Sequence, residues 1–225
     1  MTSHFDTDGY LISDPILSAA ECAEIGRLVA QERDVPARNM LGLDWCHKLA
    51  QRLASPAMGA RLIPPDSIAV QCTYFEKSPR RNWLVTLHQD LSIPVAERIE
   101  NPDLSGWSEK DGVLYTQPPA GLLEQLVAVR LQLDAPGPDD GALRVVAGTH
   151  VLSRLDDKAA HALRERIGET TCPVPLGGAL FMRPLLLHAS SKLRGDVTRR
   201  VLHFVFGPRV LPHGLRWAAC APVAR

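Results

Sequence analysis

A succession of short β-rich runs between residues 66 and 208 constrains the fold of this 225-residue chain more than any other feature. The runs are rich in Val, Ile, Leu, Thr and aromatic residues, which favour strands, and turns with Gly, Pro or Asp separate them. Many short strands joined in this way are typical of a sandwich or a jelly roll. We expect strands at 9–12, 67–75, 83–88, 113–117, 126–133, 142–146, 170–174, 179–182 and 199–206, and a helix over 157–167.

The N-terminal part, residues 14–56, has helical patterns instead. The sequence Ser18-Ala19-Ala20-Glu21 fits a capping box, and apolar residues follow it at helical spacing to about Arg33. A second helix is expected from about Leu43 to Ala54. The expected architecture is therefore mainly β, with a jelly-roll core over residues 66–208 and flanking N-terminal α-helices, in a single domain of residues 1–225.

A long polar segment, residues 91–112, interrupts the β-rich part and contains two prolines and two glycines. Long irregular loops of this kind are commonly active-site lids or disordered segments. We expect an irregular connection here, forming a compact lid that continues to about residue 125.

The overall composition excludes several classes of function. The formal net charge is +0 and the sequence pI is about 7.1, so there is no bulk attraction to nucleic acid or anionic membranes. We see no signal peptide and no apolar run of the roughly 20 residues that span a bilayer. The 5 cysteines are scattered and form no CxxC pair, which favours reduced thiols in a cytoplasmic protein.

The stretch Asn82–Asp90 begins as a strand and ends in His-x-Asp. Side chains alternate along a strand, so His88 and Asp90 project from one face and Gln89 from the other. An imidazole and a carboxylate on one face can bind one metal ion. The same pair also fits a polar strand end at the surface, so a further ligand is needed to decide.

A second informative stretch runs from Gly177 to Ser190, where a glycine turn leads into an apolar run that ends in His188. Taken alone, His188 reads as a core histidine bonded to backbone. Arg199 stands eleven residues later, where an apolar β run begins. Its charge is costly to bury unpaired, but its planar guanidinium matches a ligand carboxylate. The alternative is a solvent-facing strand end, which we expect for Arg200.

Together, His88, Asp90 and His188 make a set of two histidines and one carboxylate. Such a set suits Fe(II), since it holds one face of the ion and leaves positions for a cosubstrate and O₂. Manganese, cobalt or nickel can occupy the same ligands. The absence of a cysteine ligand argues against a structural zinc site.

The segments Phe75–Pro79, Asn82-Trp83 and His88–Leu91 resemble the metal-binding region of phytanoyl-CoA dioxygenase-like proteins. These are Fe(II)- and 2-oxoglutarate-dependent oxygenases built on a double-stranded β-helix, a cupin-like jelly roll. Asp139–Val145 with Gly148–His150 resembles the family's turn before the lid helix, and Gly178–Arg199 resembles its distal ligand and cosubstrate anchor. The resemblance covers about residues 9–217.

Carried over residue by residue, the resemblance implies specific roles. His88, Asp90 and His188 would be the iron ligands and the catalytic centre. Arg199 would pair with the distal carboxylate of 2-oxoglutarate and Ser190 would hydrogen-bond to it. Gln71 stands where relatives contact cosubstrate or substrate, although an exposed strand face explains it equally well. Arg130 is either a cation of the pocket or part of the polar outer face of its strand.

The resemblance implies a dioxygenase that hydroxylates an unactivated C–H bond of a small-molecule substrate and releases succinate and CO₂. Its cofactors would be Fe(II), 2-oxoglutarate and O₂. Asp90 favours hydroxylation, because relatives that halogenate lack this carboxylate. Two alternatives are a non-catalytic metal-binding jelly roll and a cupin-type enzyme that does not use 2-oxoglutarate. Arg199 and Ser190 argue against the latter. Acyl-CoA, amino acid and secondary-metabolite substrates all fit the sequence.

Overall fold

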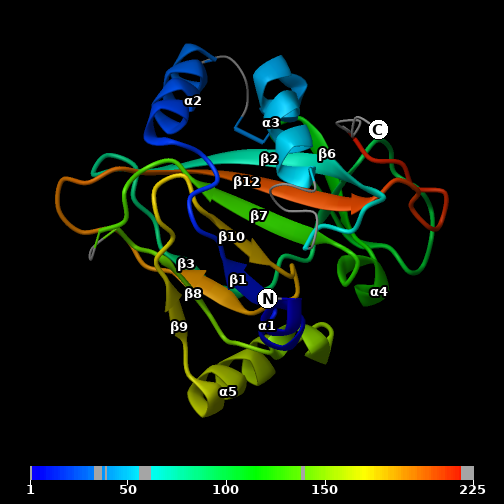
Figure 1. The fold of residues 1–225 in the computed structure, drawn as a ribbon. Helices are drawn as coiled ribbons and strands as arrows, with labels where there is room; N and C mark the ends of the chain where they lie inside the picture. Colours follow the sequence, from blue (N-terminus) through cyan, green and yellow to red (C-terminus); the bar gives the residue numbers. More distant parts are fainter. Residues whose placement is uncertain (1, 33–36, 39, 56–61, 138–139, 219–225) are drawn as a thin grey trace.

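The computed structural model describes residues 2–32, 37–38, 40–55, 62–137 and 140–218. Two antiparallel sheets face each other and helices cover the outer face of the larger one (Figure 1). The larger sheet has the order β1-β10-β7-β12-β2, and the smaller has the order β3-β11-β8-β9. Their strands are β1 (Tyr10–Ile12), β2 (Ser67–Lys77), β3 (Val85–His88), β7 (Val127–Gln132), β8 (Leu143–Val145), β9 (Thr170–Cys172), β10 (Ala179–Met182), β11 (His188–Ser190) and β12 (Arg199–Pro208).

Alternation along β12 explains how the larger sheet is buried on both faces. Leu202, Phe204 and Phe206 are fully buried in a core beneath the helices α2 (Ala19–Gln31) and α3 (Asp44–Ala54). The intervening Val201 and His203 face the smaller sheet and line a cavity between the two sheets. Both faces of the strand are thus occupied, which the mostly apolar sequence of β12 reflects.

The N-terminal helices form as the sequence predicts. Ser18 Oγ accepts a bond from the backbone N–H of Glu21, and the Glu21 carboxylate accepts one from the backbone N–H of Ser18. This is the predicted capping box. The first predicted helix ends at Gln31, with the predicted Arg33 outside the described residues. The other helices and turns are α1 (Thr2–Asp8), η1 (Met40–Gly42), α4 (Ala120–Leu123), η2 (Thr149–Leu152) and α5 (Asp157–Ile167).

The expectation of an irregular segment over residues 91–112 is wrong. This segment contains β4 (Ile93–Val95) and β5 (Ser105–Lys110), which pair with β6 (Val113–Gln117) in a separate three-stranded sheet. The sequence of β5, Ser-Gly-Trp-Ser-Glu-Lys, is exposed or half-buried throughout, so it carries no apolar alternation to reveal a strand. Short α1 and the three-residue β11 were likewise not predicted.

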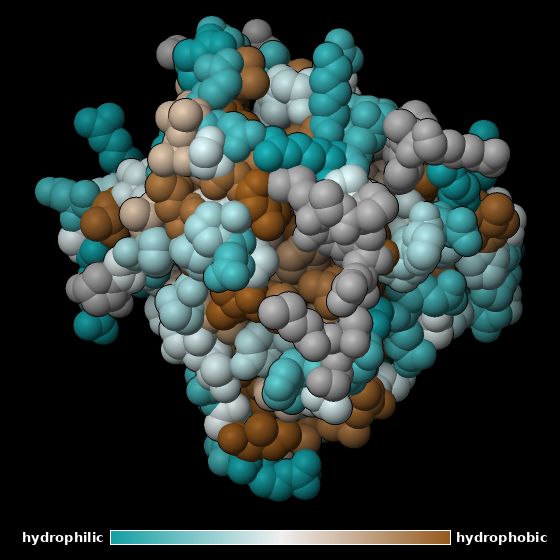
Figure 2. All heavy atoms as spheres, viewed as in Figure 1, coloured by the Kyte–Doolittle hydropathy of each residue, from teal (hydrophilic) through white to brown (hydrophobic). Residues whose placement is uncertain are grey.

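The surface is mixed in character. Polar and apolar side chains are interspersed on the face seen in Figure 2. None of the helices in the described ranges is both long enough and apolar enough to cross a membrane. The described cysteines, namely Cys22, Cys46, Cys72 and Cys172, are all buried free thiols.

Candidate metal centre

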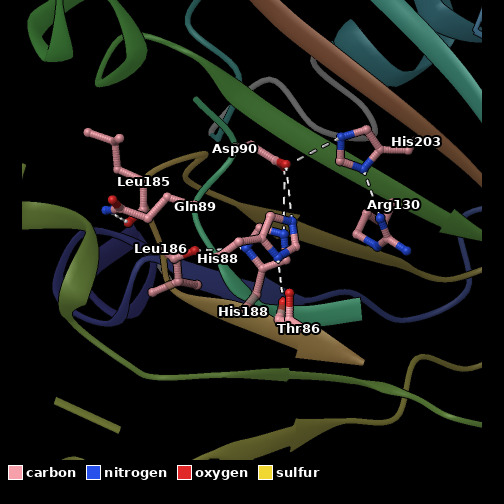
Figure 3. A network of polar contacts seen from close by, with 9 residues as sticks. All are labelled: Thr86, His88, Gln89, Asp90, Arg130, Leu185, Leu186, His188 and His203. Carbon is pink, nitrogen blue, oxygen red and sulfur yellow. Dashed lines mark hydrogen bonds and ion pairs between the residues drawn. The ribbon is translucent and has the colours of Figure 1, made fainter. Parts of the chain in front are cut away.

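The three predicted ligands meet because β3 and β11 are neighbours in the smaller sheet. His188 lies directly opposite His88 in the antiparallel register, although 100 residues separate them in sequence. Asp90 lies two residues beyond the end of β3, and its backbone N–H donates to Pro184 O at 2.9 Å. One ligand atom from each of the three residues lies within 4.8 Å of the others (Figure 3). The strand ends at His88, as the predicted strand over 83–88 does, and the Asp90 side chain beyond it converges with His88.

Hydrogen bonds fix the orientation of both imidazoles. His88 Nδ1 lies 2.8 Å from Thr86 O, and His188 Nδ1 lies 2.8 Å from Leu186 O. A carbonyl oxygen only accepts, so each Nδ1 carries the proton and each Nε2 keeps its lone pair. Those Nε2 atoms lie 3.6 Å and 3.7 Å from the two carboxylate oxygens of Asp90. Metal-binding histidines are typically oriented by such a bond from their other nitrogen.

The electrostatics of the site keep the donor atoms of Asp90 and His188 unprotonated, whereas at His88 burial is outweighed by the hydrogen bond and charge of Asp90, which raise the pKa of this imidazole. Burial opposes the ionisation of Asp90, but the nearby imidazoles of His188 and His88 outweigh it and hold the pKa of this carboxyl well below its usual range. Burial lowers the pKa of His188 to about 4. A carboxylate and a neutral imidazole at neutral pH are the protonation states in which these groups bind a cation.

Gln89 stands between two ligands and points to the other side, as predicted. Its Nε2 donates to Ser153 O at 2.8 Å and to Leu185 O at 2.7 Å. Its Oε1 accepts from the backbone N–H of Leu155 at 2.9 Å. This buried amide therefore ties the loop that carries Asp90 to two other segments of the chain.

A pair formed by an imidazole and a guanidinium, His203 and Arg130, lies beside the proposed ligands. Arg130 Nη1 lies 3.1 Å from His203 Nδ1, and His203 Nε2 lies 4.0 Å from Asp90 Oδ2 (Figure 3). Because arginine only donates, His203 Nδ1 is the acceptor and Nε2 carries the proton. Burial, followed by the charge of Arg130, lowers the pKa of His203 to about 3, so this imidazole is neutral. Arg130 therefore lies in the cavity between the sheets and not on the polar outer face of its strand.

Sequence reasoning did not select His203. The alternation of side chains along β12 could have indicated it, because His203 stands four residues after Arg199 and therefore on the same strand face.

Arg199 is buried, as the sequence predicts, and lies at the far end of the same strand face. It is 7% exposed, and its Nε has no hydrogen-bond partner among the described residues. In the register of β12 and β2 it lies opposite Lys77, which is buried, although its place beyond the predicted strand end at Phe75 favours a solvated surface charge. Burial, reinforced by Arg199, lowers the pKa of Lys77 to about 8.

Arg200 points to the opposite face. Its guanidinium forms an ion pair with Asp134, with Nη2 2.6 Å from Oδ1, so it is half-buried rather than a simple solvent-facing strand end.

Ser190 and Gln71, the remaining predicted site residues, both line the cavity. Ser190 Oγ accepts a bond from Lys77 Nζ at 2.8 Å, and Lys77 Nζ also donates to Ser191 O at 2.7 Å. The Ser190 hydroxyl proton is thereby free to be donated elsewhere. Gln71 Nε2 donates to Thr73 Oγ1 at 2.9 Å.

A cavity of about 410 Å³ joins these groups. The potential metal ligands stand on the side of the smaller sheet, and the larger sheet supplies Lys77, Arg130, Arg199 and His203. The cavity thus offers a cation site and several fixed cations that suit a small dianion. Its apolar walls come from Phe75, Trp83, Leu91, Tyr115, Leu126, Val201 and Val205.

Comparison with known families decides the classification. The sequence profile of the phytanoyl-CoA dioxygenase (PhyH) family matches residues 5–201. The chain belongs to this family. Membership confirms the resemblance, the mainly β jelly-roll fold, and the expectation of a non-haem enzyme that depends on Fe(II) and 2-oxoglutarate. No curated protein sequence matches the chain significantly.

Solved structures of the PhyH-like fold are similar over most of the chain. The non-haem α-ketoglutarate-dependent epimerase SnoN from nogalamycin biosynthesis is 17% identical, with a TM-score of 0.67 over 92% of this chain and 81% of that one. The carbocyclase SnoK from the same biosynthesis is 13% identical, with a TM-score of 0.68 over 92% and 82%. HygX from Streptomyces hygroscopicus, with nickel and 2-oxoglutarate bound, is 19% identical, with a TM-score of 0.61 over 92% and 85%. At these identities the similarity establishes the fold.

Proposed function

We propose that the whole chain is one dioxygenase domain in which His88, Asp90 and His188 hold Fe(II). In this proposal the enzyme uses 2-oxoglutarate and O₂ to hydroxylate an unactivated C–H bond of a small molecule, with release of succinate and CO₂. The observation that carries it is the orientation of both histidines. Each Nδ1 is committed to a backbone carbonyl, so two Nε2 lone pairs face the space beside the Asp90 carboxylate.

The opposite end of the cavity fits the distal carboxylate of 2-oxoglutarate. Arg199 has a buried Nε without a partner among the described residues, and an unpaired buried donor is costly. Ser190 can donate its hydroxyl proton to a carboxylate, because its oxygen accepts from Lys77. Lys77 adds a second positive charge beside Arg199. These three residues form the proposed cosubstrate anchor.

The bound iron and cosubstrate supply the oxidising power, and the chain orients the reactants and shields them. The anchor fixes the far end of the cosubstrate, which sets the position of its near end beside the ligands. Gln89 holds the loop that carries Asp90 against Leu185. The apolar walls of the cavity exclude water from the reacting groups, as cofactor-dependent oxidation requires.

Hydroxylation is the reaction outcome that we favour, because Asp90 retains the carboxylate that halogenating relatives lack. A second outcome deserves a test, since SnoN and SnoK are described as an epimerase and a carbocyclase. Such reactions change the substrate without requiring that it keep an oxygen atom from O₂. The two outcomes therefore differ in the mass of the product.

The test is a turnover screen with Fe(II), 2-oxoglutarate and ¹⁸O₂ against amino acids, acyl-CoAs and small carboxylic acids. We expect at least one compound to stimulate succinate release, and its product to gain one ¹⁸O atom. His88→Ala should abolish the stimulated release. A product without ¹⁸O would show that the reaction is a rearrangement and not a hydroxylation. Undiminished succinate release by His88→Ala would overturn the iron-site assignment.

We also propose a cytoplasmic location. The described cysteines are all free thiols, which suits a reducing compartment. Measuring the fraction of native protein in the soluble cell extract would test this, and recovery from an oxidising compartment would contradict it.

A further inference from the structure

We propose that the substrate carries a negative charge, supplied by a carboxylate, and that Arg130 binds this group beside the metal centre. This inference rests on the proposed function, because the charge count below includes iron and 2-oxoglutarate. It extends that function by naming the chemical class of the substrate and the residue that recognises it.

Arg130 is placed in the cavity by the strand register. It lies in β7 opposite His203 of β12, and Ala128 on the same face also lines the cavity. The alternate residues Val127, Val129 and Leu131 are buried in the core under the helices. The half-buried guanidinium is thus directed inward, where a ligand can reach it.

The charge of Asp90 favours the charged form of Arg130, but Asp90 is a proposed metal ligand, so Arg130 has no counterion of its own. Nη1 donates to the neutral imidazole of His203, and Cζ lies 5.5 Å from the ring centroid of Phe75. Among the described residues, the guanidinium has no other hydrogen-bond partner, so Nε and Nη2 are available. Burial and the charge of Arg199 lower the pKa of Arg130 to about 10, so the group is still charged at neutral pH.

A charge count within the described residues shows what is missing. At the anchor, Lys77 and Arg199 bring two positive charges, which buried Asp140 and the distal carboxylate of the cosubstrate balance. At the metal, the two charges of Fe(II) are balanced by Asp90 and the other carboxylate of the cosubstrate. Arg130 therefore contributes one positive charge that neither bound group balances. Burying such a charge is costly unless a ligand pairs with it.

Two other cations that line the cavity, Arg38 and Lys110, have partners of their own. Arg38 Nε lies 3.6 Å from Asp111 Oδ2. The exposed Lys110 has its Nζ 5.2 Å from the ring centroid of Tyr115. Both charges are thus engaged by Asp111 and Tyr115, so they do not replace Arg130 as a recognition group.

A carboxylate fits the geometry that is available. The free Nε and Nη2 of Arg130 can donate two parallel bonds to its two oxygens, which is the arrangement that arginine favours. On the same strand faces, the apolar Leu126, Ala128 and Val205 also line the cavity. The expected substrate is a small acid with an apolar body.

The first arm of the test asks whether Arg130 serves the cosubstrate instead. Arg130→Met and Arg199→Met would be titrated anaerobically with 2-oxoglutarate after loading with Fe(II), following the visible charge-transfer band. We expect Arg130→Met to bind 2-oxoglutarate within about twofold of the wild type, and Arg199→Met to bind it at least ~tenfold more weakly. An equal loss in both variants would overturn the inference. Absence of the band in the wild type would instead contradict the proposed function.

The second arm measures charge recognition by calorimetric titration of the protein loaded with Fe(II) and 2-oxoglutarate. The probes are 3-phenylpropionate and its neutral amide, which share an apolar body. The acid should bind the wild type at least ~tenfold more tightly than the amide. Arg130→Met should lose this preference and Arg130→Lys should keep part of it, while Arg38→Met should keep all of it. Equal binding of the two probes to the wild type, or a preference that survives in Arg130→Met, would overturn the inference.

Discussion

Replacing Lys77 by methionine is expected to weaken 2-oxoglutarate binding. The variant should also lack the fall in 2-oxoglutarate affinity that the wild type shows at alkaline pH. Lys77 is 3% exposed and lies opposite Arg199 at the proposed anchor. Its Nζ bonds to Ser190 Oγ and Ser191 O, so it both orients the serine and adds a charge. Methionine has a similar length but neither the charge nor the donors.

The size of the effect follows from the charge. Hydrogen bonds that involve a charged group contribute about 1.5–3 kcal/mol, which corresponds to a loss in affinity of roughly 10- to 150-fold. Burial lowers the pKa of Lys77 from 10.5 to about 8. Because an anionic ligand favours the charged amine, 2-oxoglutarate affinity of the wild type should fall above about pH 8, by up to about tenfold per pH unit.

The lowered pKa of Lys77 also predicts how the free energy of unfolding of the unliganded protein depends on pH. The folded pKa of Lys77 lies below the unfolded value, so the folded state loses its proton first as the pH rises. The cost of the buried charge, up to about 3 kcal/mol, is therefore present below pH 8 and is relieved between pH 8 and 10.5. Lys77→Met should not share this rise in the free energy of unfolding.

The assay is an anaerobic titration of the Fe(II)-loaded protein with 2-oxoglutarate from pH 7 to 9.5. Lys48→Met, at an exposed position of α3, is the matched control and should behave as the wild type. Affinity in Lys77→Met that equals the wild type at pH 7 would refute the role of Lys77 in the anchor. A wild-type affinity that stays constant to pH 9.5 would refute the charge argument.

Three further predictions concern the elements that support the site. Gln89→Ala removes the hydrogen bonds to Ser153 O and Leu185 O and should lower iron affinity roughly 10- to 100-fold. Competition with a chelator would measure this affinity. An unchanged value would show that the loop carrying Asp90 is held in place without Gln89. Ser18→Ala should lower the free energy of unfolding by ~1 kcal/mol, because the bond from the Glu21 backbone N–H to Ser18 Oγ is lost. Urea unfolding would measure this, and an unchanged free energy would mean that the cap is dispensable. Gly177→Ala should reduce the yield of folded protein sharply, because φ is +74° and a Cβ would collide with Leu17 O. Normal circular dichroism and thermal stability of this variant would contradict the prediction.

Local signals in the sequence predicted the elements that local chemistry determines. The capping box at Ser18 and the helix over 157–167 depend on residues close in sequence, and both form as expected. The polar strand β5 has no apolar alternation, and β11 is only three residues long after a buried apolar run. Neither pattern distinguishes a strand from a loop without its pairing partner.

The site required non-local information. Nothing near His188 indicates that it lies opposite His88, and the two segments were joined by the chemistry of a shared ligand set and by the resemblance to a family. The face of Arg130 depends on the register of β7 against β12, which alternation alone left undecided. The sequence favours a solvated surface charge for Lys77, because a buried lysine is unusual and the strand extends two residues beyond its apolar run.

The central claim is that His88, Asp90 and His188 hold an iron ion to which 2-oxoglutarate binds. Its most direct test is the anaerobic addition of Fe(II) and 2-oxoglutarate to the wild type and to Asp90→Ala, with absorbance and bound iron measured together. We expect one iron per chain and a visible charge-transfer band in the wild type, and loss of both in Asp90→Ala. Bound iron without the band in the wild type, or an unchanged band in Asp90→Ala, would contradict the claim.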